Sequence, residues 1–464
     1  MLWNCLQTNR RPYSDGGMGV KRGKGVASRS ADKRLRQEAG LDLAGAGEGV
    51  AEEAKLGLVV REVWPPRPVQ AELQQWVEQL CTSVRACPLP AANPVALLLP
   101  GPEPGPAYTG GTGASCRAVG PLAAGSLVFP SAVGRLHLSL ESGNWNCSLA
   151  QLASHLTAQP ALATNVQFFQ GLFDKEPGLQ LRPAGKLGRH LTVELAAGPG
   201  PGEADTLAAR EPYKTADTAV RVWARQRGLH LPPGLAATLL LHCRHTGLTS
   251  DNMTAWQVVR RLWSTLAGLG NLEGKQLILG LVEPVPGPGP SPLLDRDGQT
   301  VLYPGLARPQ WAALTEWAGR ADGLEAALLT RPPKAALYDT VFTVSGAAGA
   351  GAVQSSLARG LGGRVVSLAL LGGRRAWSPG EPARFTLQLG VRLEPTKAGE
   401  PCTLGPPAAS KEAADFRAWW GDRAELRRFP DGAVREAVVW GGEGLGRVGE
   451  VSSIPFSTFH CHLS

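Results

Sequence analysis

The chain has 464 residues, 43% of them hydrophobic, and a formal net charge of +8. This length allows two to four domains, and the apolar content is sufficient for packed cores. The sequence contains no run of eighteen apolar residues and no signal-peptide core at its start, which argues against a membrane-spanning or secreted chain. We therefore expect an intracellular protein whose cysteines stay reduced.

The positive charge is concentrated at the N-terminus. Residues 1–40 hold nine Lys or Arg against three acids, a net charge of +6, which leaves +2 for the other 424 residues. Because this segment is rich in Gly and Ser, we predict a basic, disordered tail over residues 1–60. Nuclear targeting, RNA neutralisation and a simple solvated linker all remain open for it. Its candidate RNA-contacting residues are Lys21, Arg22, Lys24, Lys33, Arg34 and Arg36.

Clusters of Gly and Pro divide the rest of the chain into blocks. In residues 61–204, apolar residues at helical spacing predict a helix over Gln70–Val84. A second helix is predicted over Ser148–Ala158, with Ser148 as its N-cap. Three runs with strand alternation follow within residues 165–195. This block is therefore expected to be α+β.

The block at residues 205–334 is predicted to be helical. Between Thr215 and Leu269 the apolar period is 3.6, and three segments carry helix-start residues and end in Gly. We expect at least three helices there. The predicted core residues are Val222, Trp223, Leu239, Trp256, Val259, Leu262 and Trp263.

Two short clusters of histidine and cysteine are candidates for metal sites. His242, Cys243 and His245 belong to an apolar helix, where buried side chains are expected, and a second cluster occupies His460–His462. Neither cluster has a second ligand pair at zinc-finger spacing. We predict no metal site at either position.

The block at residues 335–440 is predicted to be an α/β domain, followed by an atypical tail over 441–464. Its pattern predicts a strand within 335–344, a helix within 346–363 and two strands within 364–395. The order strand, helix, strand, strand is compatible with an α/β unit.

The stretch Phe416–Trp440 holds five arginines, four carboxylates and three tryptophans. Because the charges nearly cancel, an ion-paired fold element is favoured over an RNA-binding strip, although both remain open. Asp422 and Glu425 are expected to pair with Arg423 or Arg428 at helical spacing.

The same stretch has a predicted order of elements. A helix should end near Trp420, Pro430–Gly432 should form a turn with Gly at positive φ, and Val434–Trp440 should be a strand. Arg427 and Arg428 are the candidates for contact with RNA phosphate.

Gly125 and Ser126 are similar to the Gly-Ser turn with which polymerase-type nucleotidyltransferases approach nucleotide phosphates. Those enzymes place two carboxylates on the following strand to bind Mg²⁺, which requires hard oxygen ligands. Here His137 and Ser139 stand at those positions. We predict a degenerate site with no catalytic residue, metal or cofactor. The alternative is an active RNA nucleotidyltransferase of the poly(A) polymerase type that uses Glu141.

Several stretches together resemble the Nrap family of nucleolar RNA-associated proteins. The most specific is Phe416–Trp440, which is similar to the family pattern F-R-x-[FW]-W-G-x-x-x-E-L-R-R-F-x-D-G-x-x-x-E-A-V-V-W almost without gaps. Val220–Leu229 and Ser250–Leu262 match less specifically. The resemblance extends over about residues 134–440.

This resemblance implies degenerate nucleotidyltransferase-like units, each paired with a helical domain like that beside poly(A) polymerase and oligoadenylate synthase cores. It implies no catalysis. It also implies a nuclear, nucleolar ribosome biogenesis factor, a structural part of the small-subunit processome in pre-ribosomal RNA processing. The expected partners are pre-ribosomal RNA and processome proteins, with small nucleolar RNA as a further candidate and no membrane. A general scaffold without RNA affinity is the remaining alternative.

The sequence departs from the family pattern in two places. Residues 85–133 resemble it poorly, so the first nucleotidyltransferase-like domain is expected to be incomplete. Family chains continue beyond the E-A-V-V-W strand, whereas residues 441–464 show no likeness to the family, so a truncated or mis-spliced product is expected. Such a chain would leave strand edges unpaired in its last domain.

Overall fold

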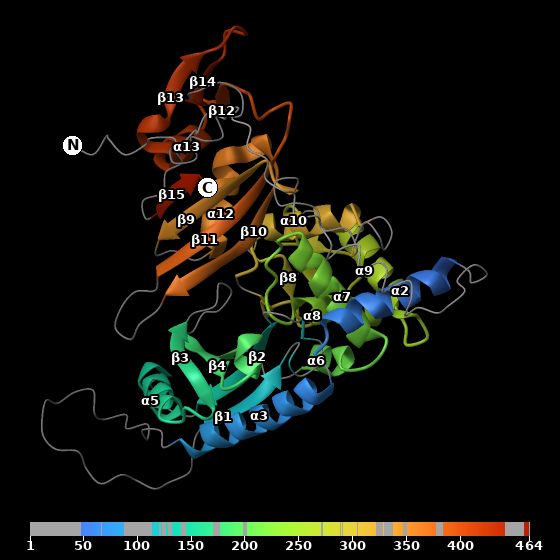
Figure 1. Cartoon of the computed structure of the whole chain (residues 1–464). Coiled ribbons are helices and arrows are strands. Elements are labelled where there is room, and N and C mark those ends of the chain that lie inside the picture. The colour runs from blue at the N-terminus through green and yellow to red at the C-terminus, as the bar shows by residue number, and fades with distance from the viewer. Residues whose placement is uncertain are drawn as a thin grey trace, which may run out of the picture. The chain divides into compact units, whose positions relative to one another are not determined.

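The computed structural model describes residues 48–65, 67–87, 114–119, 122, 127–128, 132–140, 145–169, 177–197, 202–270, 272–287, 289, 291–303, 305–321, 328, 337–346, 350–376, 384–440 and 459–463. The chain falls into two compact units, Met1–Ala51 and Glu52–Ser464, and the sheets of the described residues belong to the second. Helices and strands are mixed along it (Figure 1), which confirms the predicted α+β class.

The first domain is a mixed five-stranded sheet with the strand order β1-β2-β5-β4-β3. Strands β2 and β5 are parallel, and the other neighbouring pairs are antiparallel. Leu80 of α3, Leu152 of α5 and Leu136 of β2 are fully buried in one core. The elements are α3 (Arg67–Ala86), β1 (Ala114–Val119), β2 (Ala132–Leu140), α5 (Trp145–Thr157), β3 (Ala163–Phe169), β4 (Gly178–Pro183), η2 (Leu187–Arg189) and β5 (Leu191–Ala196).

Helix α5 begins three residues earlier than predicted, at Trp145. Ser148, the predicted N-cap, therefore lies inside the helix, where it is fully buried. The indole Nε1 of Trp145 donates to the carbonyl oxygen of Pro177 at 2.9 Å, which anchors the first turn to the start of β4. This tertiary contact extends the helix beyond the local capping signal, so the N-cap prediction is wrong.

The second domain is built mainly from helices. Trp223 of α7 packs against Trp263 of α9 with ring centroids 5.6 Å apart, and Trp256 lies 5.7 Å from Trp263. All seven predicted core residues are buried, which confirms that core. The elements are α6 (Glu203–Ala208), α7 (Tyr213–Gln226), α8 (Leu235–His245), α9 (Ala255–Leu269), β6 (Lys275–Ile278), β7 (Val285–Pro286), β8 (Leu293–Leu294) and α10 (Arg308–Gly319).

Most of helix α2 (Glu48–Val63) falls within residues 1–60, the segment predicted to be a disordered tail. Leu56, Val59 and Val60 are buried in the core of the helical domain. The carboxylate of Glu53 accepts the backbone N–H groups of Ala255 and Trp256, which are otherwise unpaired at the start of α9. The predicted tail boundary at residue 60 is thus corrected, because this segment has its own place in a folded core.

The third domain contains an antiparallel sheet with the order β10-β11-β9-β15. Strand β9 starts at Thr340, five residues later than predicted, and α12 lies between β9 and β10 in the chain. The aliphatic side of α12 packs on this sheet through Val353 and Leu357, both fully buried. The elements are β9 (Thr340–Gly346), α12 (Ala350–Leu361), η4 (Gly362–Arg364), β10 (Val365–Ala376), β11 (Arg384–Leu393) and β15 (Phe459–Leu463).

Strand β15 comes from the segment predicted to be an atypical tail. Its backbone pairs antiparallel with β9, from Phe459 opposite Gly346 to Leu463 opposite Phe342. Strand β9, in the domain for which unpaired strand edges were expected, is therefore paired on both sides, with β11 and with β15.

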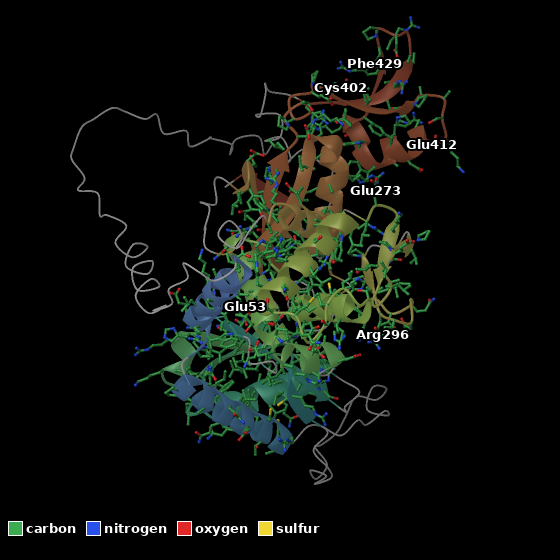
Figure 2. All side chains as sticks on the ribbon, turned by 90° about the vertical axis from the view of Figure 1, so that its right-hand side faces the viewer. Glu53, Glu273, Arg296, Cys402, Glu412 and Phe429 are labelled. Atoms are coloured by element: carbon green, nitrogen blue, oxygen red, sulfur yellow. The ribbon has the colours of Figure 1, made fainter. Side chains whose placement is uncertain are left out.

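A smaller antiparallel sheet, β12-β14-β13, completes the third domain. Figure 2 labels Phe429 at the tip of the hairpin formed by β13 and β14, and Cys402 on β12. Gly432 has φ +80 in the turn of this hairpin, as predicted. The elements are β12 (Cys402–Pro407), α13 (Glu412–Trp420), η5 (Gly421–Arg423), β13 (Glu425–Arg428) and β14 (Val434–Val439).

Within the described ranges, none of the helices combines the length and apolar character needed to cross a bilayer.

Candidate nucleic-acid interface

The five-stranded sheet has one apolar face and one polar face. On β2, Leu136 and Leu138 are buried in the core, and alternation places Arg135, His137 and Ser139 on the other side. Ser139 is exposed, whereas Arg135 and His137 are half-buried. We call this side of the sheet the polar face. The described strands contribute to it Arg117, Arg135, His137, Ser139, Gln167, Gln180, Arg182 and Glu194.

Strand pairing brings the basic groups of the polar face together. Arg117 of β1 stands directly opposite His137 of β2, and Arg135 stands opposite Glu194 of β5. The parallel pairing of β2 with β5 is what places Glu194 beside Arg135. Three arginines and one carboxylate leave the polar face with a positive charge.

The environment of His137 favours a neutral imidazole. Burial lowers the pKa of this histidine, and the charges of Arg135 and Arg117 lower it further. Its Nδ1 atom is buried and has no hydrogen-bond partner within the described structure. At neutral pH the imidazole is therefore a neutral donor and acceptor near the charges of Arg135 and Arg117.

The polar face does not fit a magnesium ion. His137 and Ser139, for which degenerate positions were predicted, lie on this face of β2, and neither is a carboxylate. Glu194 is the one carboxylate on the five described strands, and it faces Arg135. Hard oxygen ligands are what Mg²⁺ requires, so two guanidinium groups beside a single carboxylate oppose its binding. Gly125, Ser126 and Glu141 lie outside the described residues.

The β13–β14 hairpin carries the two arginines predicted to contact RNA. Alternation along β13 puts Arg427 on the same side as Glu425, and an ion pair joins Arg427 Nη2 to Glu425 Oε2 at 2.7 Å. Both side chains are about half exposed. Arg428 points to the other side of the strand and is exposed. The expected pairing of Glu425 at helical spacing is wrong, because these residues form a strand.

Other residues of Phe416–Trp440 make contacts that stabilise the fold. Arg417 of α13 donates to Glu436 of β14 at 2.6 Å, and the Glu436 side chain is only 2% exposed. Trp420 packs against Trp440 with their ring centroids 6.0 Å apart, near perpendicular. These contacts tie α13 to the β12-β14-β13 sheet, which confirms the interpretation of this stretch as an ion-paired structural element.

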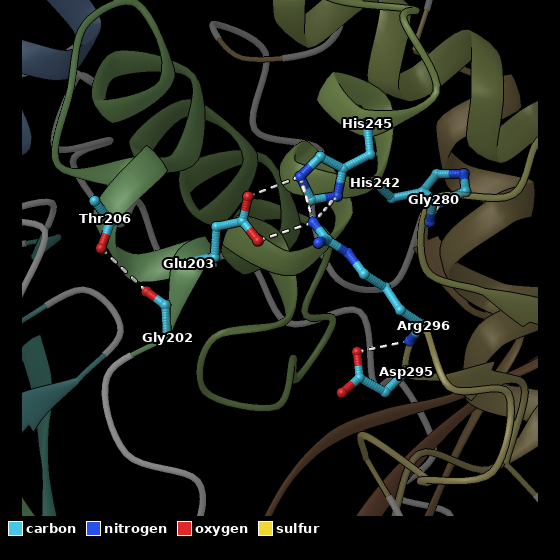
Figure 3. A network of polar contacts seen from close by, with 8 residues as sticks. All are labelled: Gly202, Glu203, Thr206, His242, His245, Gly280, Asp295 and Arg296. Carbon is cyan, nitrogen blue, oxygen red and sulfur yellow. Dashed lines mark hydrogen bonds and ion pairs between the residues drawn. The ribbon is translucent and has the colours of Figure 1, made fainter.

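The histidines of α8 join neighbouring segments of the helical domain (Figure 3). His245 Nε2 lies 2.9 Å from Glu203 Oε1, and Arg296 Nη2 lies 2.8 Å from Glu203 Oε2. His242 Nδ1 accepts the backbone N–H of Gly280 at 3.2 Å. Each histidine thus has a polar partner in the protein, and within the described residues no group of three potential ligands gathers around a metal position.

Burial separates Cys243 from this network and raises the pKa of its thiol to about 12. The second cluster, His460–His462, lies on β15, for which the structure describes the backbone. The basic residues predicted in the tail, Lys21, Arg22, Lys24, Lys33, Arg34 and Arg36, lie outside the described residues.

Two basic residues of the polar face were missed by sequence reasoning. The alternation of apolar residues along Ala132–Leu140 could have placed Arg135 beside His137 on one side of a strand. Arg117 had no such signal, because β1 has only six residues and its pairing register depends on β2.

Residues 337–453 match the family model described as Nrap protein domain 3. This part of the chain is therefore similar to an Nrap domain. This confirms the family resemblance found in the sequence, and the Nrap domain includes the β9–β11 sheet, α12, α13 and the β13–β14 hairpin. Val220–Leu229 and Ser250–Leu262 precede the matched residues.

Several relatives found by sequence share one name. The chain is 46% identical over 99 residues to Nucleolar protein 6 of Xenopus tropicalis. The aligned residues make up 20% of this chain and 9% of the relative. It is 58% identical over 55 residues to Nucleolar protein 6 of Homo sapiens, covering 12% of this chain and 5% of the relative. The chain thus spans less than a tenth of the length of these relatives. The predicted nucleolar localisation agrees with their name.

The solved structures similar to this chain include RNA-polymerising enzymes. One is the Cid1 poly(U) polymerase, with a TM-score of 0.42 and 10% identity, covering 60% of this chain and 98% of that one. Another is mtPAP in complex with GTP, with a TM-score of 0.41 and 10% identity, covering 72% of this chain and 78% of that one.

Proposed function

We propose that this protein is a non-enzymatic factor of ribosome biogenesis in the nucleolus. In this proposal it is a structural component of the small-subunit processome during pre-ribosomal RNA processing, and it binds pre-ribosomal RNA and other assembly proteins. The Nrap domain supports the assembly role.

The proposal that the protein is not an enzyme is supported by the residues on the polar face. A nucleotidyl transfer that depends on Mg²⁺ needs carboxylates to hold the ion near the reacting phosphate. Strand β2 presents Arg135, His137 and Ser139 there, and the opposing strand residue is Arg117. Such a set of groups repels a divalent cation and attracts an anion.

The first experiment is purification of the tagged chain from cells after ultraviolet crosslinking. Co-sedimentation with pre-ribosomal particles and crosslinks to pre-ribosomal RNA are expected. A chain that sediments free of particles would overturn the assembly role. Particle association without RNA crosslinks would instead identify a scaffold that binds proteins alone.

The enzymatic alternative has a direct test in the incorporation of labelled nucleotide into an RNA primer in the presence of Mg²⁺. We expect no more incorporation than in the same reaction without the protein. Incorporation that disappears in the Ser126→Ala variant would establish an active nucleotidyltransferase and refute the non-enzymatic proposal.

A further inference from the structure

The described strands give the polar face of the five-stranded sheet three guanidinium groups and one carboxylate. Arg117 is exposed and stands opposite His137 in the β1–β2 register. Like charges directly opposite on neighbouring strands destabilise a sheet unless a counter-charge is present or one group is neutral. Here the lowered pKa of His137 keeps its imidazole neutral beside Arg117.

We propose that the polar face binds a phosphate group at Arg117, Arg135 and His137, without a metal ion. The proposal rests on the RNA association proposed above and names a site for it. A guanidinium offers a planar fork of N–H donors that matches phosphate oxygens, and a neutral imidazole can add one more donor.

Geometry supports a single anion at this place. Arg117 and His137 are paired residues on adjacent strands, so their Cβ atoms stand about 5 Å apart on one face. Arg135 lies two residues before His137 on the same side of β2. One phosphate, with several acceptor oxygens, can therefore contact more than one of these side chains.

Electrostatics point in the same direction. The pKa of His137 is lowered partly by Arg135 and Arg117, which means that both guanidinium charges act at the imidazole. Glu194 of β5 offsets part of the charge beside Arg135, whereas Arg117 lies on β1, opposite His137. Arg117 is accordingly the side chain whose removal should affect anion binding most.

The phosphate can come from an RNA backbone or from a free nucleotide. The test measures fluorescence anisotropy of a labelled oligouridine of about 20 nucleotides with the full chain. It is run in EDTA, so that any binding is independent of divalent metal. Unlabelled UTP is added as a competitor in a second arm, where displacement would show that nucleotide phosphate uses the same site.

The variants are Arg117→Ala and a matched control, Arg85→Ala. Arg85 is also exposed, but it lies on α3, whose apolar side packs on the opposite face of the sheet. Arg117→Ala should weaken RNA binding by about tenfold and reduce the dependence of log K on log salt by about 0.7 for one lost contact to a single strand. Arg85→Ala should change the affinity by less than about twofold.

A conservative variant separates charge from geometry. Arg117→Lys keeps the positive charge but loses the planar fork, so its affinity should fall between those of the unmodified chain and Arg117→Ala. Circular dichroism and thermal unfolding verify that the exposed substitutions leave the fold intact.

Several results would overturn the inference. Equal affinities of Arg117→Ala and Arg85→Ala would remove Arg117 from the binding site, and loss of all binding in EDTA would show that a metal is required. If the unmodified chain does not bind the labelled RNA, both the phosphate site and the proposed RNA association fail. If it binds RNA and Arg117→Ala does not weaken it, the phosphate site alone fails.

Discussion

The ion pair between Arg417 and Glu436 should contribute more to stability than any other pair in the Phe416–Trp440 stretch. Glu436 is 2% exposed and Arg417 is 53% exposed, and the two side chains meet at 2.6 Å. Arg417→Ala leaves a buried carboxylate without its cation. Breaking a fully buried pair costs about 3–5 kcal/mol, but water can reach Glu436 once the exposed arginine is gone. We therefore expect a loss of about 1–3 kcal/mol.

Hydrogen exchange measured by mass spectrometry on peptides from residues 402–440 can test this locally, without assuming that the whole chain unfolds in one step. A loss of that size should accelerate exchange in β14 by roughly 5- to 150-fold. The matched control is Arg427→Ala, which removes an arginine from the half-exposed pair with Glu425. That pair contributes little, at most about 1 kcal/mol, because solvent screens it.

The reasoning would be refuted if Arg417→Ala and Arg427→Ala accelerated exchange equally. A second check is the double variant Arg417→Met with Glu436→Met, which removes both charges and keeps side-chain volume. Because replacing a buried pair by apolar groups is often neutral, this double variant should exchange more slowly than Arg417→Ala. Faster exchange would show that packing, and not the uncompensated charge, is responsible.

Three further predictions concern the helical domain. Trp223→Ala should destabilise it by about 3–5 kcal/mol, because the ring is fully buried against Trp263, and thermal unfolding followed by circular dichroism measures the loss. Thr254→Ala should cost about 1 kcal/mol, since Thr254 caps α9 and accepts from Gln257 N; an unchanged melting temperature would contradict this cap. Burial, reinforced by the charge of His245, lowers the pKa of His242 from 6.5 to about 4. The unfolded chain thus binds more protons between these values, and stability should fall by up to about 3 kcal/mol as pH drops through this window. His242→Gln should flatten that dependence in urea titrations at several pH values, and an unchanged slope would assign it to another group.

Local sequence patterns correctly predicted those helices and turns that depend on apolar periodicity or on turn-forming residues. The 3.6-residue period identified α7, α8 and α9 and their buried residues, because an amphipathic helix must bury its apolar side wherever it packs. Pro430–Gly432 was identified as a turn because Gly adopts positive φ at little cost. The specific order of residues in Phe416–Trp440 was the strongest indication of the Nrap family.

Tertiary structure decided what depends on residues distant in sequence. Helix α2 is stabilised by packing on the helical domain, and its Glu53 caps a helix some two hundred residues away, a contact that no local pattern encodes. The pairing of β15 with β9 likewise depends on long-range hydrogen bonds. The polar face itself exists because strand register places Arg117 opposite His137, and register is a property of two strands together. Sequence periodicity determines which residues are buried. Charged side chains from different strands come together in a site only when the sheet has folded.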